Sequence, residues 1–247
     1  MSSLTRRTWR AAALCAVLGL ATLSLGPGAA AAGEQASPAL TLTLPFGFYI
    51  GDDQQPTTSH VAKLGSDIVF PQGRFDGVLV DDKISGKLLI PTTSSYFVAF
   101  RFMPATGTVE LVPDGDAAGT AKIKSAPDET GTGLRAVTDV TARVFIKLTA
   151  VRVAGKPLDV GDGCRTAQPA VVNIKAVLPL AAPKEGQPRP STRVTSTFDT
   201  PPFAGCGVTE DLSPLLTGLV AGPGNTLLTN LALRCTSSGP PPNGCGK

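Results

Sequence analysis

A regular alternation of apolar and polar residues runs through Asp139–Ala150 (DVTARVFIKLTA). The even-numbered positions of this segment are apolar, and the odd-numbered positions are polar apart from Phe145. A period of two residues is typical of a β-strand with one face in the core and the other in solvent. The alternation then changes phase, because Val151 and Val153 are the next apolar positions. This change predicts a β-bulge, or a strand that passes from one sheet to another.

Shorter segments of the same kind recur along the chain. They predict strands at Phe75–Val80, Gly86–Ile90, Tyr96–Met103, Thr108–Val112, Thr120–Lys124, Pro157–Val160, Ala170–Leu178, Thr192–Phe198 and Thr226–Leu233. Only Asp211–Val220 is typical of a helix, with Pro214 tolerated in its first turn. Many short strands and one helix predict an all-β fold. We expect a single antiparallel β-sandwich, or a barrel-like form of it, with one short helix near the C-terminus.

The first 32 residues are typical of an export signal. Arg6, Arg7 and Arg10 form a basic start, residues 11–25 are largely apolar, and the alanines at 30–32 fit the small-residue cleavage pattern. The apolar segment is shorter than the roughly 20 residues that span a bilayer, so no transmembrane anchor is expected after cleavage. The paired arginines fit either the general secretory or the twin-arginine route. The expected organisation is a signal peptide at 1–32, a β-sandwich domain at 33–237 and a Pro/Gly-rich tail at 238–247.

Removal of this signal changes the charge of the chain. The full sequence has 22 Lys and Arg against 19 Asp and Glu, and three of the arginines belong to the signal, so 22 − 3 = 19 basic residues remain. A neutral chain without a cluster of basic residues argues against nucleic acid or an anionic membrane as a partner. We expect a secreted or cell-envelope protein with no nucleic acid partner.

Four cysteines remain after cleavage: Cys164, Cys206, Cys235 and Cys245. An even number of cysteines in an exported chain predicts two disulfides, for which three connectivities exist. Glycines flank Cys206 on both sides and prolines precede it, a pattern that bends the chain. We therefore interpret this segment as a corner held by a disulfide rather than as a loop around a nucleophilic thiol.

Two of these cysteines lie in segments that resemble a known family. The segments are VRVAGKPLDVGDGCRTAQP (Val151–Pro169) and PPFAGCG (Pro201–Gly207). They are similar to the V-G-x-x-C-x-T hairpin and the P-P-F-x-G-C-G corner of an actinobacterial family of secreted, β-rich proteins without an established function. The resemblance implies an exported β-rich domain and brings no catalytic residues with it.

A hypothesis for the disulfides follows from these two motifs. A Cys164–Cys206 bridge would join the hairpin to the corner, and a Cys235–Cys245 bridge would fold the Pro-rich tail back onto the last strand. The alternative pairs Cys206 with Cys235 and Cys164 with Cys245.

Candidate chemistry in the chain is sparse. His60, the only histidine, lies in a polar stretch next to Ser59 and is expected to be an exposed loop residue, since the chain has no triad signature. Pairs of carboxylates occur at Asp52–Asp53, Asp81–Asp82, Asp114/Asp116 and Glu210–Asp211, all in turn-like contexts. Pro113–Lys122 imitates the start of a calcium loop, with Asp114 and Asp116 as its first ligands. The later ligands are missing, so we expect a hairpin turn at Pro113–Asp116. We expect no catalytic residue, no cofactor and no metal.

These observations favour a non-catalytic structural or binding protein of the cell envelope or extracellular space, with an unknown ligand. One alternative is a secreted hydrolase that uses carboxylates or His60. Another is a carrier of an apolar ligand, which requires the sheet to part into a cavity that alternation alone does not reveal.

The export signal makes a first prediction. Cleavage after Ala32 should release a mature chain that starts at Gly33. Intact-mass spectrometry of the culture supernatant checks this expectation. Full-length protein found only in the cytosol would contradict it.

Overall fold

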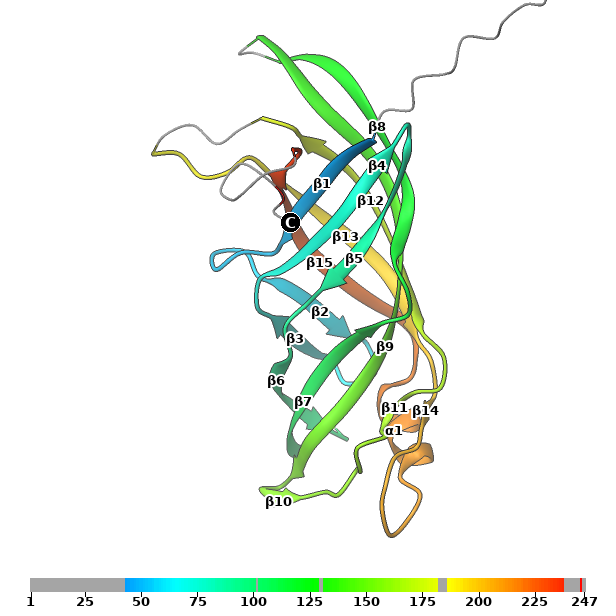
Figure 1. The fold of residues 1–247 in the computed structure, drawn as a ribbon. Helices are drawn as coiled ribbons and strands as arrows, with labels where there is room; N and C mark the ends of the chain where they lie inside the picture. Colours follow the sequence, from blue (N-terminus) through cyan, green and yellow to red (C-terminus); the bar gives the residue numbers. More distant parts are fainter. Residues whose placement is uncertain (1–42, 101, 129–130, 182–185, 238–244, 246–247) are drawn as a thin grey trace, which may run out of the picture. The chain divides into compact units, whose positions relative to one another are not determined.

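The computed structural model describes residues 43–100, 102–128, 131–181, 186–237 and 245 (Figure 1). The expected signal peptide at 1–32 and most of the expected tail at 238–247 lie outside these residues. Within the described part, the chain forms fifteen strands and one helix, and every strand pair is antiparallel within a single sheet. The predicted all-β fold class with one short helix is therefore confirmed.

The elements follow one another along the chain as strands, with the helix just before the last of them. They are β1 (Thr43–Ile50), β2 (Thr57–Val61), β3 (Ser66–Phe70), β4 (Gly73–Val80), β5 (Lys83–Leu89), β6 (Thr93–Ala99), β7 (Met103–Pro113), β8 (Ala117–Asp128), β9 (Gly131–Val153), β10 (Lys156–Pro157), β11 (Arg165–Thr166), β12 (Ala170–Pro179), β13 (Ser191–Thr200), β14 (Phe203–Ala204), α1 (Ser213–Val220) and β15 (Gly222–Cys235).

The longest strand, β9, changes neighbours along its length. On one side, the first half of β9 pairs with β8 and its second half pairs with β7. Both β7 and β8 are antiparallel to β9, so they run in the same direction as each other. The chain therefore does not reverse at residues 114–116. It bulges there while the amide of Asp114 donates to the carbonyl of Arg143 at 2.8 Å. The hairpin turn expected at Pro113–Asp116 was wrong, because β8 continues along β9 after the bulge.

The last strand, β15, is divided in the same way. β13 follows it on one side over Gly222–Ala232. On the other side β2 pairs with Thr226–Leu228 and β1 pairs with Leu231–Cys235. Residues 51–56 connect β1 to β2 outside regular strand structure. Each of the two long strands thus has two successive partners on one side.

These divisions curl the sheet into two rings (Figure 1). The first ring runs through β1, β4, β5, β8, the first half of β9, β12, β13 and β15. β12 and β13 meet where the Thr192 hydroxyl donates to the carbonyl of Val177 at 2.8 Å. The second ring runs through β15, β2, β3, β6, β7 and the second half of β9, and β3 meets β6 where the Thr93 hydroxyl donates to the carbonyl of Val69 at 2.7 Å. β11, β14 and α1 lie on its remaining side.

Each ring has its own hydrophobic core. The first contains Phe46, Leu79, Ile84 and Leu178 together with several small alanines. The second contains Phe70, Val109, Leu148, Phe203 and the Cys164–Cys206 bridge. The two rings therefore bury separate sets of apolar side chains while they share long strands.

The change of phase in β9 is a β-bulge, as the alternation predicts. Thr106 pairs with Arg152 and Thr108 with Thr149, so β9 carries one residue more than β7 over this interval. Ala150 takes a positive φ of 51° at this point. The bulge allows Leu148 and Val151 to be buried on the same side of the strand.

Several expectations about local structure need correction. The strands β1, β2 and β3 are absent from the sequence prediction. For β2 the reason is its polar sequence, in which the inward residues Thr57 and Ser59 are polar yet buried. His60 lies in β2 rather than in a loop, although its side chain is exposed as expected. The helix starts at Ser213 rather than Asp211, and the expected strand Pro157–Val160 is reduced to β10.

In the part of the chain that the structure describes, no helix combines the length and apolar character needed to cross a membrane.

Both disulfides have the connectivity expected from the sequence. Cys164 is bonded to Cys206, and Cys235 is bonded to Cys245. Cys164, Cys206 and Cys235 are buried. The backbone turns sharply beside Cys206, where Gly205 and Gly207 have positive φ angles and the amide of Gly207 donates to the carbonyl of Val160 at 2.7 Å. The segment is a corner held by a disulfide.

The two bridges should contribute differently to stability. Replacing Cys164 and Cys206 by alanine opens a loop of 42 residues, which should cost about 4 kcal/mol of unfolding free energy in the chain-entropy description. The matched variant Cys235→Ala/Cys245→Ala opens a loop of 10 residues and should lose about 3 kcal/mol. Urea denaturation under non-reducing conditions measures both. A larger loss in the tail variant would contradict this ranking.

Candidate functional site

The second ring encloses an apolar cavity of about 240 Å³. Apolar side chains from every strand of that ring line it, among them Ile68, Phe97, Val109, Ile146 and Leu227. The polar residues in its lining are Ser59 and Thr200. An apolar wall of this kind can interact with a ligand only through the exclusion of water from apolar surface and through dispersion contacts.

The cavity exists because several inward positions do not fill the ring. Ala99 and Ala105 are small residues on its wall, where larger side chains would occupy the space. The alternation of apolar residues changes phase at Ala150, and the bulge there compensates for the change. Leu148, Val151 and Val153 therefore all line the cavity. The interior of the first ring is much fuller, with a space of about 60 Å³.

Beside α1, the cavity shares part of its lining with a pocket at the surface. An open pocket of about 560 Å³ adjoins it, and Leu64, Phe100, Leu215 and Leu219 line both spaces. Phe100 is 52% exposed and Leu215 is 41% exposed, a degree of exposure unusual for large apolar side chains at one place. We call this opening the mouth. Lys63 lies on its rim.

The disulfide corner holds the helix that forms one side of the mouth. The hydroxyl of Thr217 accepts a hydrogen bond from the amide of Phe203 at 2.9 Å, and the hydroxyl of Ser213 accepts one from the amide of Cys206 at 3.2 Å. The amide of Leu212 donates to the carbonyl of Cys206 at 2.8 Å. The helix has eight residues and lacks a side-chain cap at its N-terminus. A short uncapped helix is a weakly stable element, so its position depends on these contacts.

The residues that sequence reasoning considered for catalysis lie elsewhere. His60 faces away from the cavity, where its Nδ1 pairs with Asp67 Oδ1 at 2.7 Å and both side chains are exposed. Its neighbour Ser59 lines the cavity, so alternation along β2 places the two on opposite faces. Among the described residues, no group of three or more His, Cys, Asp or Glu side chains is arranged to hold a metal ion.

The carboxylates considered for catalysis do not lie together, and Asp52, Asp114 and Asp211 are bonded to residues near them. Asp114 forms an ion pair with Arg143 at 3.0 Å across the bulge between β7 and β8. Asp52 accepts the backbone amides of Gln54 and Gln55 and the side-chain amide of Asn230. Burial opposes ionisation of Asp52, but these hydrogen bonds hold its pKa below the usual value. Asp211 has a lowered pKa because it accepts hydrogen bonds from Ser213 just before α1.

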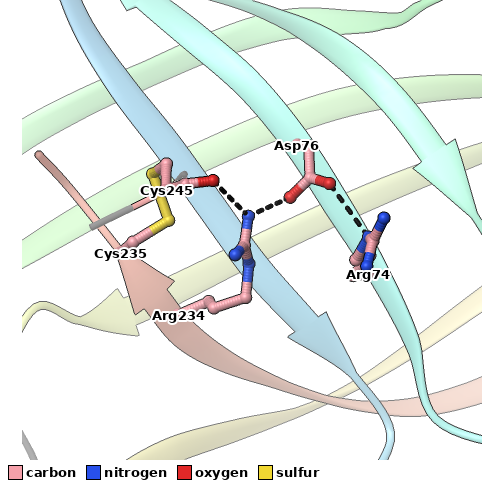
Figure 2. Close-up of polar contacts among 5 residues, drawn as sticks. All are labelled: Arg74, Asp76, Arg234, Cys235 and Cys245. Atoms are coloured by element: carbon pink, nitrogen blue, oxygen red, sulfur yellow. Dashed lines mark hydrogen bonds and ion pairs between the residues drawn. A yellow bond between two sulfur atoms is a disulfide. The ribbon is translucent and has the colours of Figure 1, made fainter. Parts of the chain in front are cut away.

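A charged network lies at the end of β15 (Figure 2). Figure 2 shows Arg234 between the carboxylate of Asp76 and the carbonyl of Cys245, with Arg74 on the other oxygen of Asp76. The Arg234 side chain is 13% exposed, and its Nε is buried without a hydrogen-bond partner among the described atoms. This network joins β4, β15 and the disulfide-bonded Cys245.

The sequence prediction did not identify the cavity. Ser59, Ile68 and Phe70 belong to the strands that it missed. The available signal was the alternation in TSHV (Thr58–Val61), where Ser59 and Val61 share one face. Phe100 and Leu215 are far apart in sequence, so their meeting at the mouth could not be read from either segment.

Comparison of the chain with models of protein families, with curated proteins and with solved structures finds no match. The resemblance to the actinobacterial secreted family therefore stays a prediction from the two motifs.

The Arg234 network leads to a prediction about stability. Asp76→Asn removes the charge that faces a largely buried guanidinium, and should lower the free energy of unfolding by about 2 kcal/mol. The control is Asp139→Asn, because Asp139 pairs with Lys175 on an exposed strand face. This substitution should change the free energy of unfolding by less than about 0.5 kcal/mol. Chemical denaturation compares the two. Equal losses would contradict a special role for Arg234.

Proposed function

We propose that this protein binds a small apolar molecule, or the apolar part of a larger one, in the cavity of the second ring. The observation that carries the proposal is the cavity itself, with its apolar wall and its opening beside α1. Of the alternatives that the sequence leaves open, this is the carrier of an apolar ligand. A hydrolase that uses His60 gains no support, because this side chain faces away from the cavity.

The size of the cavity limits what it can enclose. An engineered apolar cavity of about 150 Å³ stays dry and binds benzene, whereas pockets for drug-sized ligands measure about 300–1,000 Å³. At about 240 Å³ the space lies between these two cases. It suits an alkyl or isoprenoid chain, or a ligand with two or three aromatic rings.

The energy of binding would come from desolvation. Each buried CH₂ group contributes about 0.8 kcal/mol, so a chain of modest length can offset the loss of its own freedom on binding. The cavity is largely pre-formed, which reduces the cost of ordering the protein.

The predicted location agrees with this role. Two disulfides are compatible with an extracellular protein. Together with the expected signal at 1–32, they support a secreted or cell-envelope protein that shields an apolar molecule from water outside the cytoplasm.

Filling the cavity tests the proposal. N-phenyl-1-naphthylamine, whose fluorescence rises in apolar surroundings, should bind the wild-type protein. The variant Ala99→Leu/Ala105→Leu puts two larger side chains into the cavity and should weaken binding at least about tenfold, equivalent to about 1.4 kcal/mol.

The control for this experiment is Ala118→Leu, an exposed position on β8 in the first ring. It should bind the probe as the wild type does. Circular dichroism and thermal unfolding verify that all variants are folded. If the wild type does not bind the probe, or if the filled variant binds it equally well, the cavity is not a ligand site.

A further inference from the structure

We propose that the ligand is a single-chain amphiphile with an anionic headgroup, whose chain lies in the cavity and whose headgroup is held at the mouth by Lys63. This inference rests on the proposed function and adds the chemical class of the ligand. It follows from the four side chains that line both spaces and from Lys63, which carries the charge among the described residues of the outer pocket.

The shape of the site divides it into an inner apolar part and an outer part. Leu64, Phe100, Leu215 and Leu219 line both the enclosed cavity and the open pocket, so they form a collar between the two. A molecule that fills the cavity and continues outward must pass this collar and end in the open pocket. The part that ends there remains in contact with water and can be polar.

Lys63 is placed to meet that polar end. It belongs to the tight turn between β2 and β3, where the amide of Gly65 donates to the carbonyl of Val61 at 2.9 Å. From this turn its side chain passes over Gly222, which has no side chain in its way, toward the carbonyl of Gly218 on α1. The ammonium group therefore spans the rim from the turn to the helix.

The Lys63 ammonium keeps donors for a ligand. It forms none of the ion pairs found among the described residues, and its one hydrogen bond in that set, to the carbonyl of Gly218, is long at 3.4 Å. An ammonium group has three N–H donors, so two stay available for a carboxylate or phosphate oxygen. Among the described residues that line the mouth, Lys63 is the one with a charge.

We expect only a modest preference for anionic over uncharged headgroups, because Lys63 is exposed at the rim. An ion pair in such a position contributes up to about 1 kcal/mol, which is about a fivefold difference in affinity. The alkyl chain therefore supplies most of the affinity, and Lys63 supplies selection among headgroups.

The test uses four amphiphiles with the same chain: dodecanoate, dodecyl phosphate, dodecanol and dodecylamine. Each competes with N-phenyl-1-naphthylamine at neutral pH, low salt and concentrations below micelle formation. An anionic compound should bind the wild type about fivefold more tightly than dodecanol, with dodecylamine weakest. Tighter binding of dodecanoate identifies a fatty-acid type of headgroup, and tighter binding of dodecyl phosphate identifies a phosphate headgroup.

Two variants assign the preference to Lys63. Lys63→Met should remove the advantage of the anions while leaving dodecanol binding unchanged, and Lys63→Glu should favour dodecylamine. The matched control is Lys87→Met, which removes the same charge from β5 in the first ring and should leave the order of affinities unchanged.

The outcomes separate this inference from the proposed function. If the four compounds displace the probe with equal affinity, or if Lys63→Met keeps the anion preference, the cavity binds apolar ligands but Lys63 does not select the headgroup. If no compound displaces the probe and the probe itself fails to bind, the proposed function fails as well.

Discussion

The backbone of β9 must be hydrogen-bonded along 23 residues, and no single neighbouring strand covers that length. Unpaired backbone groups in a protein interior are costly, so each edge of a long strand needs a partner throughout. One edge of β9 is shared by β7 and β8, and one edge of β15 is shared by β2 and β1. Each of these partners takes a different next neighbour. The division into two rings follows from this need to pair two long strands completely.

The same arrangement explains why one ring is filled and the other is hollow. In the first ring, large side chains such as Phe46, Leu79 and Leu178 are buried and fill the interior. In the second ring, one side is covered by α1 and the disulfide corner. Paired strands are about 4.8 Å apart, whereas a helix with its side chains is about 10 Å wide. A ring closed partly by a helix therefore leaves more space inside.

Two carboxylates, Asp52 and Asp114, lie where the chain leaves regular strand structure. Asp52 accepts backbone amides just after β1, and Asp114 pairs with Arg143 just after β7. Both carboxylates stabilise irregular backbone at the points where one ring gives way to the other. Their turn-like sequence context was therefore informative about structure. Among the described residues, the lining of the cavity contains no charged side chain, and Lys63 lies in the adjoining pocket.

Local pattern was sufficient for much of this architecture. The alternation around Asp139–Ala150 predicts β9 and its bulge, and the two cysteine motifs predict the bridge between Cys164 and Cys206. The strand and its bulge depend on residues that are close in sequence. The bridge is one of only three ways to pair four cysteines.

The cavity depends on a different kind of information. Leu64, Phe100 and Leu215 meet at its mouth from three distant segments, and nothing in any one segment shows that the others are near. Pro113–Asp116 has the composition of a hairpin turn, yet the chain continues along β9 because that strand still has unpaired backbone groups to satisfy. Sequence determined which residues face inward, through the two-residue period of a strand. Only the tertiary structure decided which inward faces meet, because closure of a ring is set by long-range pairing and by the width of the element that completes it.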